Sequence, residues 1–172
     1  KIWNINSGEC LKTLKGHTNT VWSLVISPEG YLCSGSDDYS IKIWNINSGE
    51  CLRTLKGHTS AVLSLVISSE GYLCSGSYDN SIKIWNINID ECLRTLRGHT
   101  DAVFSLVVLS RGNLCSGSYD NLIKIWNINS GECLRTLRGH TNDVLSLVIS
   151  QEGYLCSGGG YGDKSIKIWN IN

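Results

Sequence analysis

The sequence contains no methionine, a single proline and no net charge. No apolar run reaches the ~18–20 residues that a membrane-spanning helix needs, and the opening residues show no signal-peptide pattern. Because fifteen basic residues balance fifteen acidic ones, no overall charge attracts the chain to nucleic acid or to an acidic membrane. These absences favour a globular protein without a membrane partner and disfavour a nucleic-acid partner.

Signatures of metal binding and glycosylation are also missing, since the chain has neither a Cys-X-X-Cys pair nor an Asn-X-Ser/Thr sequon. The eight cysteines form two sets that each step by 41 residues: Cys10, Cys51, Cys92 and Cys133, and Cys33, Cys74, Cys115 and Cys156. A cysteine copied at one phase of a repeat is typical of a small buried apolar residue, whereas zinc needs four converging ligands. We predict free thiols, no metal or other cofactor, and a reducing compartment, either cytoplasm or nucleus. A disulfide framework is the alternative.

What the chain does contain is a repeat. The dipeptide Gly-His recurs every 41 residues, at 16–17, 57–58, 98–99 and 139–140. The tetrapeptide Lys-Ile-Trp-Asn begins at Lys1, Lys42, Lys83, Lys124 and Lys167, and its last step is longer because the glycine-rich stretch 158–162 holds two extra residues. The period predicts four repeats over about 3–43, 44–84, 85–125 and 126–168, with no second domain.

Each repeat has the pattern of short strands. In the second repeat, apolar residues dominate 62–68, a turn with glycine follows at 69–71, and a second run covers 72–75. Residues 76–80 read as another turn, 82–85 alternate as a half-exposed strand does, and 92–96 close the unit. No segment has helical periodicity. The sequence predicts an all-β repeat of four strands.

The order Gly-His, Leu-Cys-Ser-Gly-Ser-x-Asp, Ile-Lys-Ile-Trp resembles the WD-repeat β-propeller family over essentially the whole chain. The terminal Trp-Asp of that family is Trp-Asn here, at Asn45, Asn86, Asn127 and Asn170. The resemblance implies a β-propeller of four-stranded antiparallel blades. We expect the four repeats to be part of a larger or dimeric ring.

The resemblance also implies a hydrogen-bonded tetrad of tryptophan, serine, histidine and aspartate in each blade. By motif position the four tetrads are Trp44, Ser34, His17, Asp38; Trp85, Ser75, His58, Asp79; Trp126, Ser116, His99, Asp120; and Trp169, Ser157, His140, Asp163. An alternative is a Ser-His-Asp hydrolase triad. A nucleophilic serine must be exposed, however, and here it would be bonded to a buried indole in four copies. We therefore expect structural tetrads and no enzyme activity.

Basic residues recur just before each Gly-His: Lys12, Lys15, Arg53, Lys56, Arg94, Arg97, Arg135 and Arg138. They are typical of a solvated outer strand whose charges discourage edge pairing. A phosphate-binding rim is the alternative, although Glu9, Glu50, Glu91 and Glu132 lie in the same strand and oppose it.

Positions that differ between near-identical repeats are candidates for partner binding. The first two repeats differ at seven positions, and three of these fall where propellers of this family expose one face: before and after the valine of the first strand, and before the tetrad aspartate. The predicted face comprises Thr20, Trp22, Asp37, Ala61, Leu63, Tyr78, Ala102, Phe104, Tyr119, Asp143, Leu145, Tyr161 and Gly162. Aromatic anchors flanked by charge are typical of protein-binding hot spots. The alternatives are packing of a central channel and stacking of sugars.

The sequence thus predicts a non-catalytic scaffold for a protein or peptide partner. A sugar or small-ligand propeller and a purely structural building block are the alternatives. Residues 1–6 repeat as 167–172, so the last blade lacks its outer strand while residues 10–14 form an outer strand without a blade. These duplicated ends fit best with a segment of a longer repeat array, and two copies could instead form an eight-bladed ring. We expect the chain to associate with itself.

Overall fold

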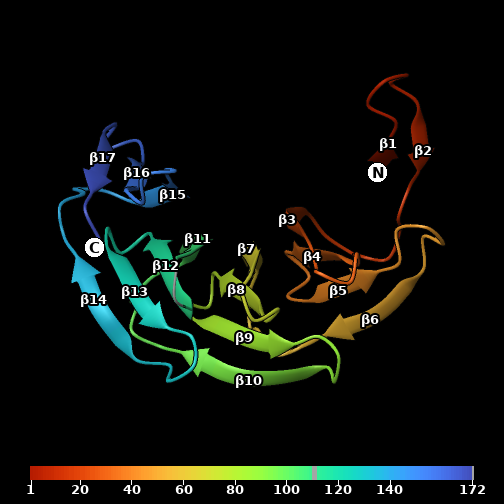
Figure 1. Cartoon of the computed structure of the whole chain (residues 1–172), viewed down its shortest axis with the longest axis horizontal. Helices are drawn as coiled ribbons and strands as arrows, with labels where there is room; N and C mark the ends of the chain where they lie inside the picture. The colour runs from red at the N-terminus through yellow and green to blue at the C-terminus, as the bar shows by residue number, and fades with distance from the viewer. Residues whose placement is uncertain (110–111, 172) are drawn as a thin grey trace.

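The computed structural model describes residues 1–109 and 112–171, and these residues form an open arc of antiparallel sheets (Figure 1). The first sheet is β3 (Val21–Ile26), β4 (Leu32–Ser36), β5 (Ile41–Trp44) and β6 (Cys51–Leu55). The second is β7 (Val62–Ile67), β8 (Leu73–Ser77), β9 (Ile82–Asn86) and β10 (Glu91–Leu96). The third is β11 (Val103–Val108), β12 (Asn113–Ser118), β13 (Ile123–Asn127) and β14 (Cys133–Leu137).

The two ends of the arc differ from these three sheets. The fourth sheet has three strands, β15 (Val144–Ile149), β16 (Leu155–Gly159) and β17 (Ile166–Trp169). At the other end, β1 (Ile2–Trp3) and β2 (Cys10–Lys12) form a separate hairpin. Within each sheet the strands follow chain order, with β3, β7, β11 and β15 on the concave side and β6, β10 and β14 on the convex side (Figure 1). This arrangement confirms the predicted all-β, propeller-like class.

One predicted boundary is wrong. The sequence predicts a turn at Gly76 and Ser77, but β8 continues through both, and Gly76 pairs with Ile82 on one side and Ser64 on the other. The reason lies in the neighbouring sheet, because a Cβ on Gly76 would lie 2.8 Å from Cγ1 of Val103. The glycine is therefore kept by close packing between sheets rather than by a turn.

The cores lie between neighbouring sheets, not within one sheet. Between the first and second sheets, the buried residues are Cys33, Ile41, Ile43 and Leu55 from the first and Val62, Leu65, Leu73, Trp85 and Ile87 from the second. The same set, displaced by one repeat, fills the space between the second and third sheets. Each sheet thus buries its apolar residues only when it has a neighbour on that side.

All eight cysteines are free thiols, but the two sets have different surroundings. Cys33, Cys74 and Cys115 are buried, and this burial raises the pKa of each thiol to about 12. The expectation of apolar packing is wrong for Cys92 and Cys133 of the outer-strand set, which are exposed, while Cys10 and Cys51 are partly buried. The exposed thiols lie on the convex edge, which no further sheet covers among the described residues. None of residues 1–109 and 112–171 belongs to a helix long and apolar enough to cross a membrane.

Candidate functional site

The second repeat shows how the tetrad is connected. The indole Nε1 of Trp85 donates to Oγ of Ser75 at 2.8 Å, and that oxygen lies 2.7 Å from Nε2 of His58. Nδ1 of His58 lies 2.8 Å from Oδ2 of Asp79. Because the carboxylate of Asp79 can only accept, Nδ1 of His58 donates to it, and Nε2 of the neutral imidazole then accepts the hydroxyl proton of Ser75. The bonds therefore run in one direction, from tryptophan to aspartate.

The structure brings the predicted side chains together in all four repeats. The corresponding distances in the other three tetrads lie between 2.6 and 2.9 Å. The serines Ser34, Ser75, Ser116 and Ser157 are buried. A hydroxyl that is buried and already accepts an indole N–H has no access to a substrate carbonyl, so the geometry argues against the hydrolase triad.

Each tetrad aspartate also closes a tight turn. Oδ1 of Asp79 accepts from the backbone N–H and the hydroxyl of Ser81, and Oδ2 accepts from the N–H of Thr59. Burial alone would raise the pKa of Asp79, but the hydrogen bonds from His58, Ser81 and Thr59 outweigh it and hold the pKa well below its usual range. The pKa values of Asp38, Asp120 and Asp163 are lowered as well. The carboxylates are thus held in their charged form.

The tetrad fixes the Gly-His loop that leads into the concave strand of its sheet. Gly57 lies against the tetrad indole so closely that a Cβ there would be 3.0 Å from Trp85. After the loop, Tyr78 donates its backbone N–H to the carbonyl of Ala61 at 2.9 Å. The end of the concave strand and the β8–β9 turn are thereby held side by side, and they supply the residues of the predicted face.

A β-bulge presents the central residue of that face. The pairing register of each concave strand shifts between its valine and the second residue after it, for example between Val62 and Ser64. The residue skipped by the register is Trp22, Leu63, Phe104 or Leu145. A bulge re-aims the side chain of the extra residue. Sequence reasoning found these positions from their variability but missed the bulge, because no turn-forming residue in the sequence marks it.

Four variable aromatic side chains, from three different repeats, form a continuous row. The rings of Trp22 and Phe104 meet edge to face at 6.5 Å, those of Phe104 and Tyr119 stack at 5.0 Å with 9° between their planes, and those of Tyr119 and Tyr78 meet at 6.3 Å. We call these four residues the aromatic row. The indole of Trp22 also donates to Asp37 at 2.6 Å.

The predicted face residues fall into three groups by burial. Ala61, Leu63 and Ala102 are buried beneath the row and form its floor, as the channel-packing alternative expected. Phe104 and Tyr119 are partly buried against this floor. The exposed members are Thr20, Trp22, Tyr78, Leu145, Tyr161 and Gly162, while Asp37 and Asp143 are partly covered. The face is therefore a buried apolar floor that carries exposed aromatic side chains.

The fourth repeat carries its insertion at this face. Gly160, not Gly162, donates the backbone bond to Asp143 at 2.7 Å that Tyr78 makes to Ala61 in the second repeat. The two inserted positions are therefore Tyr161 and Gly162, and the Tyr161 ring lies 4.8 Å from the ammonium of Lys164. The sequence pattern places Gly162 in the position of Tyr78 because it directly precedes the aspartate, and the structure corrects this.

The charges on the face are mainly acidic. Burial raises the pKa of Tyr119, and the nearby carboxylates of Asp143 and Asp101 raise it further. Asp101, which sequence reasoning did not include, is exposed beside the buried Ala102. A partner that approaches the aromatic row therefore meets negative charge.

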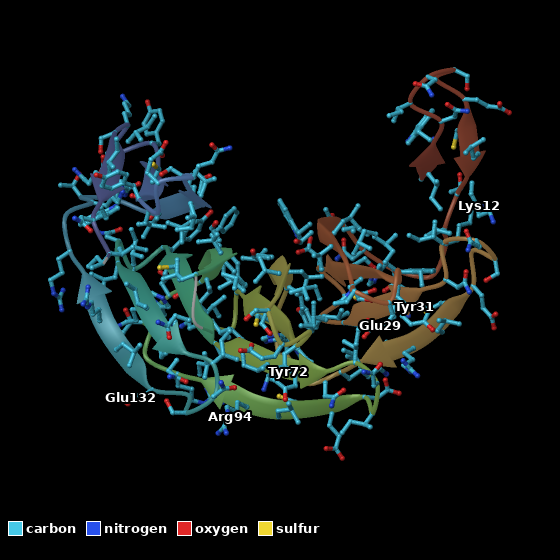
Figure 2. All side chains as sticks on the ribbon, in the orientation of Figure 1. Lys12, Glu29, Tyr31, Tyr72, Arg94 and Glu132 are labelled. Atoms are coloured by element: carbon cyan, nitrogen blue, oxygen red, sulfur yellow. The ribbon has the colours of Figure 1, made fainter. Side chains whose placement is uncertain are left out.

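The basic residues before each Gly-His lie elsewhere. Figure 2 shows Arg94 and Glu132 on the convex rim of the arc, away from the concave strands. Arg53 donates to the carbonyl of Ile87 at 2.8 Å and pairs with Asp90 at 3.2 Å. The rim thus mixes both signs, as a solvated outer edge does. Among the described residues no three His, Cys, Asp or Glu side chains converge as metal ligands.

A hollow between two sheets also lies away from the face. A cavity of about 720 Å³ opens between the third and fourth sheets and is lined by Asn113, Ile125 and Arg135. The corresponding groove one repeat earlier, beside Tyr72 (Figure 2), holds only about 240 Å³. Asn113 stands where the other repeats have tyrosine, so the smaller side chain contributes to the difference in volume.

Curated proteins match single repeats of this chain. Eukaryotic translation initiation factor 3 subunit I of Vanderwaltozyma polyspora is 50% identical over 42 residues, which is 24% of this chain and 12% of that protein. Nuclear distribution protein PAC1 of Arthroderma otae is 49% identical over 39 residues, or 22% of this chain and 8% of that protein. The match thus spans about an eighth or less of either relative.

Solved structures match nearly the whole arc. The crystal structure of the computationally designed Ika4 protein has a TM-score of 0.83 and 33% identity, covering 96% of this chain and 99% of that one. The structure of U3-55K has a TM-score of 0.80 and 31% identity, covering 92% of this chain and 54% of that one. The family model described as WD domain, G-beta repeat matches residues 8–45, 49–86, 90–127 and 131–170. The chain therefore belongs to the WD40-repeat family.

Proposed function

We propose that the chain is a non-catalytic interaction scaffold that binds a protein or peptide segment on its aromatic row. The observation that carries this proposal is the row itself, since it is built from positions that are among the few that vary between near-identical repeats. Trp22 and Tyr78 are about half exposed, at 50% and 51%, above a buried floor. Aromatic anchors on a preformed apolar floor are typical of interface hot spots.

The charges suggest which partners fit. Asp37, Asp101 and Asp143 flank the row, while the ammonium of Lys164 lies over the ring of Tyr161 in the fourth repeat. A partner segment with cationic side chains would meet carboxylates and aromatic faces together, which favours association through charge and cation–π contact. We propose a reducing intracellular compartment, cytoplasm or nucleus, because all eight thiols are free.

The row is tested by replacing Trp22 and Tyr78 with alanine, singly and together, and measuring the affinity for the partner that the folded chain captures. Since both side chains are half exposed, the melting temperature should stay nearly unchanged while the double variant loses capture. Leu93→Ala is the control, because Leu93 is also partly exposed but lies on the outer strand β10, away from the row and from both end faces.

The alternatives predict other outcomes. A structural building block would keep its partner in the double variant and lose it when the outer strands are changed. A sugar-binding propeller would bind free saccharides with the same dependence on Trp22. Unfolding of the double variant would mean that the row is core and not a binding surface.

We also propose that the ends of the arc associate with further repeats of the same kind, from a second copy in an eight-bladed ring or from a longer repeat array. The exposed apolar residues on the two end faces, which are buried at the equivalent positions inside the arc, support this proposal.

A further inference from the structure

Neighbouring sheets interlock through two contacts that recur at all three internal junctions. A Cβ on Gly35, Gly76 or Gly117 would lie 2.7–2.8 Å from Cγ1 of Val62, Val103 or Val144 in the next sheet. The backbone N–H groups of Leu65, Leu106 and Leu147 donate to Ser23, Ser64 and Ser105 of the preceding sheet at 2.9–3.1 Å. A glycine hollow and a serine hydroxyl on one sheet thus receive a valine and a leucine N–H from the next.

The two outermost faces carry the halves of one more such junction. On the first sheet, Val21 is 46% exposed and Leu24 is 61% exposed, whereas their equivalents Val62 and Leu65 are 0% and 5% exposed. On the fourth sheet, Ile166 is 79% exposed and Ile168 is 70% exposed, against 1% and 0% for Ile41 and Ile43.

The polar halves of this junction are open as well. Within residues 1–109 and 112–171, no serine of a preceding sheet accepts the N–H of Leu24, and no leucine N–H of a following sheet donates to Ser146. Among these residues, a Cβ on Gly158, the equivalent of Gly117, would have only Ser146 of its own sheet within 4 Å, at 3.7 Å. The valine that fills this hollow at every internal junction has no counterpart here.

We infer that a second copy of this chain occupies these faces, so that the first sheet of each copy docks on the fourth sheet of the other. This inference rests on the self-association proposed above and names its contacts. Val21 of one copy enters the Gly158 hollow of the other, and the N–H of Leu24 donates to Ser146 across the junction. Ile166 and Ile168 are buried as Ile41 and Ile43 are. Each contact copies one that the chain already makes three times.

The same junction adds an outer strand to the three-stranded fourth sheet. On β2, Lys12 pairs with Ile2 and Cys10 with Trp3, the register in which Arg53 of β6 pairs with Ile43 and Cys51 with Trp44. Strand β1 therefore occupies on β2 the place of the third strand of a complete sheet. In the docked pair, β17 of the other copy replaces β1, with Ile168 opposite Lys12 and Trp169 opposite Cys10.

Two copies are favoured over closure of one chain. Figure 1 shows the β1–β2 hairpin and the fourth sheet at opposite tips of an open arc, so the two end faces of one chain do not meet. Repeating the internal junction between two arcs gives two identical junctions and a closed ring of eight sheets. This number lies within the roughly 4–8 blades that propellers form, and closure leaves no open end for further growth.

The test is the mass of the purified chain in solution, measured by light scattering over a range of concentrations. The expected mass is twice the 18.9 kDa of one chain. Gly158→Leu should abolish the pair, because its side chain fills the hollow meant for Val21 while the isolated fold has room for it. Lys56→Leu adds the same side chain at an exposed site away from both end faces and should leave the mass doubled.

Removing residues 1–6 tests the strand exchange separately. Without β1 no strand has to be displaced from β2, so the shortened chain should form pairs at lower concentration than the full chain. A monomer at every concentration would overturn the inference, and so would a pair that survives Gly158→Leu. A mass that keeps increasing with concentration would show that the chains form an open array and not a closed pair. Binding of a partner to the aromatic row is measured in a separate experiment. A variant that no longer pairs but still captures the partner would leave the proposed scaffold function intact.

Discussion

At the residue scale, the tetrad tryptophan both fills the core and donates a hydrogen bond. Trp85 is 1% exposed, fills the core between the first two sheets and donates the hydrogen bond that begins the tetrad. Its ring also lies against His58, at 6.1 Å between centroids. Loss of this side chain would therefore leave a cavity and an unpaired serine at once.

Trp85→Ala should lower the free energy of unfolding by about 3–5 kcal/mol for the cavity, and the orphaned hydroxyl should add to this loss. Trp3→Ala is the matched control, because Trp3 stands in the same Lys-Ile-Trp-Asn context but is half exposed in the β1–β2 hairpin. Urea unfolding followed by circular dichroism measures both variants. Equal losses would contradict the structural role of the tetrad.

The tetrads were predictable from the sequence because their motif recurs at a fixed phase and their chemistry permits one order of donors and acceptors. The burial of the face residues could be predicted less well from the sequence. Leu63 and Trp22 occupy the same position of the repeat, yet Leu63 is buried and Trp22 is exposed. Leu63 packs with Ala61 and with Ala102 of the neighbouring repeat, whereas the larger Trp22 reaches Phe104 and Asp37, and a repeat period does not reveal such contacts between repeats.

At the scale of elements, the turn between the second and third strands of each sheet depends on a charged aspartate. Asp79 joins His58, Ser81 and Thr59, and these hydrogen bonds lower its pKa despite its burial. The equivalent turn in the third repeat has Leu122 where the others have serine, so Oδ1 of Asp120 accepts only a backbone N–H there.

Low pH should therefore destabilise the sheets, because it protonates the aspartates of these turns. A carboxylate whose folded pKa lies below its unfolded value of about 3.9 contributes its stabilisation above that pH. The contribution is lost as the pH falls toward the folded pKa. The free energy of unfolding, measured by urea titration, should thus decline below about pH 4. Asp79→Asn should lower it at pH 7 and flatten the decline, whereas an unchanged pH profile in this variant would contradict the role of Asp79.

Strand order and approximate strand bounds followed from alternation and turn residues. The extension of β8 through Ser77 did not, because Gly76 resembles a turn residue in sequence but packs against Val103 of the next sheet. The bulges at Trp22, Leu63, Phe104 and Leu145 were likewise hidden, since a register shift needs the partner strand to be seen.

At the scale of the whole molecule, curvature of the arc creates the candidate site. Trp22 belongs to the first repeat and Phe104 to the third, yet their rings are in contact. No spacing within one repeat predicts this meeting, because it depends on how much each sheet turns relative to the last. The convex rim, in contrast, spreads its mixed charges apart, so binding is expected on the concave strands and their turns.

Hydrogen exchange with and without the captured partner tests this central claim most directly. We predict that the partner protects the amides of residues 20–22, 77–80, 102–104 and 118–121, which include the aromatic row and its turns. The outer strands β6, β10 and β14 should exchange as before. Protection confined to those outer strands would contradict a scaffold that binds through its variable aromatic face, and it would instead identify a building block joined at its edges.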